Sequence, residues 1–159
     1  MSRVLIAGIG NIFLGDDAFG VEVARRCAAR DWPGRVVVRE CGIRCLDLAF
    51  LLLDPWDLVI AADTVARGGE PGTLYDIAFD PGSEAPAGLD PHRAGLDQVV
   101  AWTQRLGAAA LPPMRLIGCE PYSFAPGALS PVVEAACAPA LDMIAAIVHQ
   151  IQVQEVVQS

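Results

Sequence analysis

The sequence contains no lysine among its 159 residues and only two histidines. A nucleotide-binding P-loop ends in Gly-Lys-Ser/Thr, so the missing lysine excludes that motif. The 11 arginines are scattered along the chain, and the net charge is −8. Because a nucleic-acid surface needs clustered basic side chains, we expect no nucleic-acid partner.

Long apolar runs and paired cysteines are also missing. No uninterrupted run approaches the roughly 18 apolar residues of a membrane span, and the N-terminus enters a strand-and-turn pattern without the features of a signal peptide. We therefore predict a cytoplasmic protein with no membrane partner. The five cysteines include no Cys-x-x-Cys pair, which argues against a disulfide framework or a structural zinc site. We interpret Cys27 and Cys137 as structural.

The chain has ample apolar material for a core, since 53% of its residues are hydrophobic. We predict a single domain over residues 1–159, with a tail that frays after about residue 150. Apolar runs alternate with amphipathic ones, which indicates an α/β fold with a mostly parallel sheet of about five strands and helices on both faces. Strands are expected at residues 3–7, 35–40, 57–62, 73–77 (an edge) and 114–119. Helices are expected at residues 16–30, 45–53 and 94–106, and from Pro131 onward with a kink at Pro139.

The segment GIGNIFLGDDAFG, residues 8–20, follows the first expected strand. Ligands of open α/β sheets bind at the carboxyl ends of the strands, so this segment places Asp16 and Asp17 where chemistry usually occurs. Either aspartate could instead cap the first helix, but both cannot occupy the same cap. Phe13 stands where the dinucleotide-binding pattern Gly-x-Gly-x-x-Gly needs its third glycine, which excludes that pattern.

Other polar side chains follow the remaining strands and are expected at the same edge. Two carboxylates and an imidazole with open positions suit a divalent metal such as nickel or zinc, and they could also perform acid–base chemistry without metal. Taken singly, each of these residues has a structural explanation, such as capping or solvation. The residues concerned are Asp16, Asp17, Glu40, Asp63, Glu120 and His92.

Three further segments add to residues 8–20 in a fixed order along the chain. They are VIAADTVARGGEPGTLY (59–75), LDPHRAGL (89–96) and LIGCEPYSFAPGALSPVVEAA (116–136). Together the four segments resemble the hydrogenase maturation endopeptidases, proteases specific for the large subunits of nickel–iron hydrogenases. The resemblance covers nearly the whole chain.

The resemblance implies a three-layer α/β/α sandwich and a specific activity. The enzyme would be a monomeric aspartic-type endopeptidase that removes a C-terminal peptide from the hydrogenase large-subunit precursor after nickel insertion. It would recognise the nickel carried by that precursor and bind the metal only weakly by itself. By motif, the catalytic and metal-contacting residues fall on Asp17, Asp63 and His92, which leaves Asp16 to support the loop and the start of the helix.

Two departures from the family pattern concern substrate contacts more than the metal site. The chain has Glu40-Cys41-Gly42 where the family usually has Asp-Gly-Gly, and Ala128 where glycine is common. Two other functions stay open from the residues. One is a non-catalytic chaperone or binding module for the nickel-bearing large subunit. The other is a small-molecule hydrolase or phosphorylase, which the scarcity of basic residues disfavours.

Overall fold

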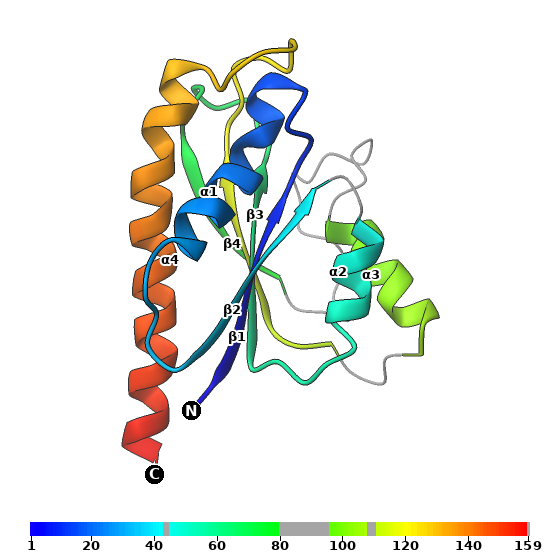
Figure 1. The fold of residues 1–159 in the computed structure, drawn as a ribbon, viewed down its shortest axis with the longest axis vertical. Coiled ribbons are helices and arrows are strands. Elements are labelled where there is room, and N and C mark those ends of the chain that lie inside the picture. The colour runs from blue at the N-terminus through cyan, green and yellow to red at the C-terminus, as the bar shows by residue number, and fades with distance from the viewer. Residues whose placement is uncertain (43–44, 80–95, 108–110, 159) are drawn as a thin grey trace.

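The computed structural model describes residues 1–42, 45–79, 96–107 and 111–158, so His92 lies outside the described residues. The described part contains a five-stranded sheet in the order β2-β1-β3-β5-β4, in which only β4 runs antiparallel to its neighbour (Figure 1). The strands are β1 (Arg3–Ile9), β2 (Arg35–Gly42), β3 (Leu58–Thr64), β4 (Leu74–Phe79) and β5 (Met114–Cys119). The helices are the 3₁₀ turn η1 (Gly15–Ala18), α1 (Phe19–Ala28), α2 (Cys45–Leu51), α3 (Leu96–Arg105) and α4 (Pro131–Gln158).

This architecture confirms the predicted fold class, with differences at the ends of elements. β4 is an edge strand, as the sequence indicated, and it runs antiparallel to β5. β3 continues two residues past Ala62, because Asp63 and Thr64 still pair with Gly118 and Cys119 of β5. The expected helix at residues 16–30 begins instead as η1 and becomes α-helical at Phe19.

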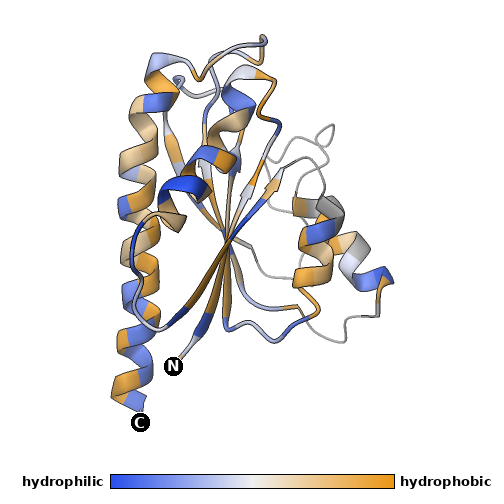
Figure 2. Cartoon of the chain, viewed as in Figure 1, coloured by the Kyte–Doolittle hydropathy of each residue, from blue (hydrophilic) through white to orange (hydrophobic). Residues whose placement is uncertain are grey.

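Helices cover both faces of the sheet, which gives three layers. α1 and α4 lie on one face and α2 and α3 on the other (Figure 1). Alternate residues of β1 serve the two cores: Ile6 packs in the α1–α4 core and Leu5 in the other, and both are fully buried. The strands at the centre of the molecule are correspondingly hydrophobic (Figure 2). This alternation fixes which side chains reach each face.

Helix α4 is long and apolar, with a mean hydropathy of 1.7 over its best 18-residue window. By length and composition alone it is the one described helix that could cross a membrane, whereas counting uninterrupted apolar runs had found none. Its buried face packs against the sheet through Val133, Cys137, Ile144 and Val148. Packing in the core thus accounts for part of the apolar composition, since 39% of that window is buried.

The helix also runs continuously through Pro139 and past the point where we expected fraying. It is helical to Gln158, and the Gln152 side-chain amide donates a hydrogen bond of 3.1 Å to the Ser2 carbonyl. Glu155 accepts hydrogen bonds from the Ser2 backbone N–H and the Ser2 hydroxyl and forms an ion pair with the N-terminal amine. These contacts hold the last turns of α4 beside the start of β1.

Helix α1 approaches the sheet closely at Gly20. A Cβ atom at this position would lie 2.1 Å from the Ala62 carbonyl oxygen and 2.3 Å from the Ile9 carbonyl oxygen. Both neighbours are backbone atoms of the central strands, which cannot move aside without disturbing the sheet. Glycine is therefore required here by the distance between helix and sheet.

Candidate active site

Thr64 links the two aspartates that the sequence analysis selected. Its backbone N–H donates a hydrogen bond of 2.8 Å to Asp63 Oδ1, and its hydroxyl donates one of 3.2 Å to Asp17 Oδ1. The Asn11 backbone N–H donates to the other oxygen of Asp17 at 3.0 Å. Asp17 therefore lies at the end of β3 beside Asp63, held by donors from two different strand ends.

The position of this pair suits chemistry at the sheet edge. Asp63 is only 8% exposed, and it lies near the carboxyl end of β3, next to the carboxyl end of β1. The Asp17 side chain does not cap the first helix, because neither η1 nor α1 has a side-chain hydrogen bond at its N-cap. Two carboxylates that accept hydrogen bonds from the same residue at a strand end can accept a proton, orient a water molecule or bind a cation.

Asp16 has a different structural role from Asp17. It is fully buried, and it accepts hydrogen bonds from the backbone N–H groups of Tyr122, Ser123 and Ser130 at 2.7–2.9 Å, and from the Ser130 hydroxyl at 2.9 Å. Asp16 therefore supports the opening segment (residues 10–18), as expected. Its partners lie in the final loop (residues 120–130), more than 100 residues away in sequence, and not in the first turn of α1.

The pKa of Asp16 reflects two opposed effects. Burial alone would raise the pKa of this carboxyl group, but the hydrogen bonds from Ser130, Ser123 and Tyr122 lower it more. The net result is a pKa below the ordinary aspartate value. The charged form is therefore favoured in the folded protein, and the hydrogen bonds to it stabilise the fold.

Acid is expected to weaken the fold partly through Asp16. A carboxyl group with a lowered folded pKa stabilises the protein above its unfolded pKa of about 4, and this contribution is lost as the pH falls through the folded pKa. Asp16→Asn should lower the free energy of unfolding at pH 7 by about 2 kcal/mol and flatten its decline between about pH 5 and pH 2. Denaturant unfolding at a series of pH values tests this, with the exposed Asp142→Asn as control. Identical pH slopes in Asp16→Asn and the parent protein would contradict it.

Neither Glu120 nor Glu40 has a hydrogen bond to Asp17 or Asp63 among the contacts that the structure describes for them. Both carboxylate oxygens of Glu120 accept hydrogen bonds from the Arg67 backbone N–H, at 3.1 and 2.8 Å, so Glu120 holds the loop after β3. Glu40 pairs with Arg25. Among the described residues, no group of three or more His, Cys, Asp and Glu side chains could hold a metal ion. The expected convergence of several carboxylates thus reduces to Asp17 and Asp63, with His92 outside the described residues.

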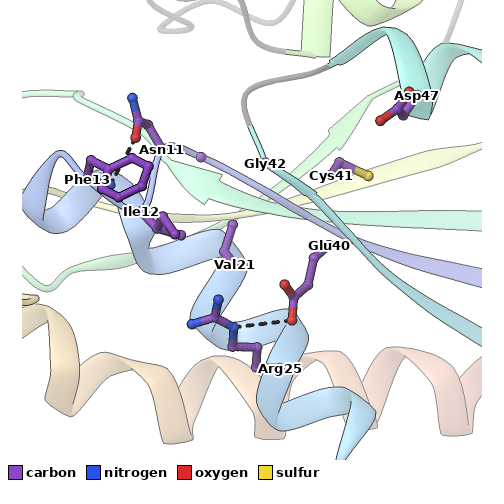
Figure 3. Close-up of a pocket in the computed structure, with 10 residues that line it drawn as sticks. Asn11, Ile12, Phe13, Val21, Arg25, Glu40, Cys41, Gly42 and Asp47 are labelled. Carbon is purple, nitrogen blue, oxygen red and sulfur yellow. Dashed lines mark hydrogen bonds and ion pairs between the residues drawn. The ribbon is translucent and has the colours of Figure 1, made fainter.

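A pocket of about 310 Å³ lies between the opening segment and the end of β2 (Figure 3). Asn11, Ile12 and Phe13 of the opening segment line one side, and Glu40 and Cys41 at the end of β2 line the other. It therefore opens beside the carboxyl ends of β1 and β2, and the backbone of its wall residue Asn11 donates to Asp17.

An ion pair lies in this pocket. Arg25 Nε lies 3.2 Å from Glu40 Oε1, and about half of each side chain is exposed. Exposed ion pairs of this kind contribute less than about 1 kcal/mol, so a ligand can separate them at little cost. Glu40 thus stands in the pocket at the position where the sequence departs from the usual aspartate.

The cysteines of the α1–α4 core are structural, as predicted for two of them. Cys27, Cys119 and Cys137 are fully buried. Burial raises the pKa of the Cys27 and Cys137 thiols to about 11 and that of Cys119 to about 12. Because the thiolate is the reactive form, none of the three is a nucleophile at neutral pH.

Comparison with known proteins now identifies this arrangement. The family model described as hydrogenase maturation protease matches residues 21–147. The chain belongs to the hydrogenase maturation protease family. This confirms the resemblance found in the sequence and identifies the protein as a peptidase.

Individual relatives show that the similarity extends over nearly the whole chain. The hydrogenase 2 maturation protease of Escherichia coli is 29% identical over 97% of this chain and 95% of its own. The solved structure of the E. coli hydrogenase-maturating endopeptidase HybD has a TM-score of 0.79 at 30% identity, covering 93% of both chains. A nickel–iron hydrogenase maturation protease from Thermococcus kodakarensis has a TM-score of 0.70 at 29% identity, again over 93% of both chains.

Sequence reasoning missed Thr64 as a member of the site. It selected Asp63 and assigned the threonine that follows it no role. The available signal was its position directly after Asp63, where a backbone N–H and a hydroxyl can reach two carboxylates at once. In this member of the family, Thr64 is the residue that connects the two aspartates.

Proposed function

We propose that this protein removes a C-terminal peptide from a nickel–iron hydrogenase large-subunit precursor after nickel has been inserted. The observation that carries the proposal is the Asp17–Thr64–Asp63 linkage at the sheet edge of a maturation protease. The partner is a precursor protein that already holds nickel, so the metal arrives as part of the substrate. We expect the protease to act as a monomer in the cytoplasm.

The residues proposed to contact nickel are Asp17, Asp63 and His92. Two carboxylates and one imidazole are ordinary ligands for a divalent transition metal, and three protein ligands leave positions for groups of the precursor. A precursor without nickel lacks the atom that these three side chains would share. Recognition of the metal therefore makes cleavage conditional on its insertion.

In the proposed mechanism, nickel positions the precursor and a carboxylate performs the proton transfer. Asp17 or Asp63 accepts a proton from water, whose oxygen attacks the carbonyl carbon of the scissile peptide bond. The C–N bond then breaks, and the amine of the released peptide takes up the proton. Thr64 acts as a positioning residue, because its hydrogen bonds keep both carboxylates in place.

Cleavage of the precursor is expected to require nickel. The purified protein is mixed with nickel-loaded and with nickel-free large-subunit precursor, and intact masses are followed over time. We expect the C-terminal mass loss only with the loaded precursor. Equal cleavage of both forms would contradict recognition of nickel while leaving the protease activity in place. Absence of cleavage of the loaded form would overturn the proposed function.

A further inference from the structure

Two neighbouring loops expose large apolar side chains at the edge of the sheet that carries the aspartates. Phe13 of the opening segment is 72% exposed, and Tyr122 of the final loop is 71% exposed. The segment between β1 and α1 is correspondingly hydrophobic in Figure 2. Exposed apolar groups gathered in one place are typical of protein-binding surfaces. The set, named here the apolar rim, consists of Ile12, Phe13, Leu14, Tyr122 and Phe124.

The two loops that carry the apolar rim are joined by hydrogen bonds. The Asp16 backbone N–H donates a hydrogen bond of 3.0 Å to the Ser123 carbonyl, and the Asp16 carboxylate accepts from the N–H groups of Tyr122 and Ser123. At Gly15, which has a φ of +53°, an added Cβ would lie 2.5 Å from the Ala125 carbonyl oxygen. The loop backbones are therefore in direct contact.

These hydrogen bonds between the loops lower the entropic cost of binding a partner. Loops usually lose conformational freedom when a partner docks, and that loss weakens the complex. Here a buried carboxylate with four hydrogen-bond donors already fixes the backbone on both sides of the apolar rim. Rigid aromatic side chains such as Phe13 and Tyr122 then add contact area with little further loss of freedom.

The apolar rim continues into the candidate active site. Ile12 and Phe13 belong both to the rim and to the wall of the pocket beside Glu40. Asn11, the preceding residue, holds Asp17 through its backbone N–H. A protein that rests on the rim would therefore have its polypeptide next to the pocket and the aspartate pair.

We propose that the apolar rim is the docking surface for the folded part of the hydrogenase large-subunit precursor, which rests on the function proposed above. The precursor would cover the rim with apolar surface while its C-terminal extension enters the pocket. A second copy of this chain is the less suitable occupant, because it would close the edge that the substrate must reach. Two copies, each with a net charge of −8, would also repel each other.

The test changes the rim without touching the aspartates. The variant Leu14→Ser/Tyr122→Ser, which spares the pocket wall, is compared with Val153→Ser/Val157→Ser, two exposed apolar residues near the end of α4. On nickel-loaded precursor we expect the rim variant to raise KM at least about tenfold, with kcat at saturating precursor within about twofold of the parent. The α4 control should leave both constants unchanged. Far-UV circular dichroism and thermal unfolding verify that both variants are folded.

Binding measured separately distinguishes the rim from the proposed function. Both pairs of changes are introduced into Asp63→Asn protein, and precursor binding is followed by calorimetry. Weaker binding only in the rim variant supports the proposal, even if the parent protein proves unable to cleave the precursor. Unchanged KM and affinity in the rim variant would overturn it. A parent protein that sediments as a dimer, and a rim variant that sediments as a monomer, would overturn the choice of occupant.

Discussion

Asp63→Asn is expected to abolish cleavage of the nickel-loaded precursor while leaving the fold intact. Asparagine has the same size and can still accept the hydrogen bond from the Thr64 N–H through its amide oxygen. It lacks the negative charge needed to accept a proton or contact nickel, so we expect a rate loss of at least about 10²-fold. His92→Ala should lose activity to a similar degree. Intact-mass kinetics on the precursor measure both effects.

The matched control for this prediction is Asp142→Asn. Asp142 is an exposed aspartate of α4 and belongs to none of the segments that form the candidate site. It undergoes the same chemical change away from the sheet edge, and its rate should equal that of the parent. Cleavage by Asp63→Asn at the parent rate would remove Asp63 from the catalytic and metal-contacting residues.

Gly20→Ala should have the largest effect on stability. The new methyl group would lie 2.1–2.3 Å from two backbone carbonyl oxygens of β1 and β3, so α1 must move away from the sheet. Overpacking against backbone atoms that cannot rotate aside should cost about 3 kcal/mol or more. In a chain of this length, that loss lowers the unfolding midpoint by about 10 °C. Differential scanning calorimetry is the direct measurement.

Gly68→Ala provides a comparison that separates steric clash from backbone strain as the cause of destabilisation. Gly68 has a φ of +79°, but no heavy atom lies within 4 Å of its added Cβ. Its substitution should therefore show only the cost of a left-handed backbone, about 1 kcal/mol. If Gly20→Ala proved no more destabilising than Gly68→Ala, the close approach of α1 to the sheet would not be the reason for glycine at position 20.

The layers of the fold could be predicted from the sequence because alternating burial leaves a local pattern. The β-branched run in β2 and the apolar run in β3 were each visible within six residues. The ends of the elements were harder to predict from the sequence, since they depend on pairing with residues elsewhere in the chain. β3 extends through Thr64 because β5 provides a partner for it, and β5 lies about 50 residues later in the chain.

The candidate site was only partly predictable for the same reason. Asp63 could be selected because it follows an apolar strand, and the family resemblance separated Asp17 from Asp16. The partners of Asp16 could not be predicted from the sequence, because nothing local to Tyr122, Ser123 and Ser130 indicates that their N–H groups bind a carboxylate more than 100 residues away. Glu120 shows the opposite case: its place after a strand suggested a site residue, whereas its carboxylate holds the Arg67 backbone.

The link between Asp16 and Ser130 also bears on when the enzyme becomes competent during synthesis. Both aspartates of the candidate site lie within the first 63 residues of the chain. The opening segment gains its last fixed contacts only after the chain has reached Ser130, about four-fifths of the way through the sequence. A nascent chain shorter than this carries the aspartates but lacks the fastened loops beside them.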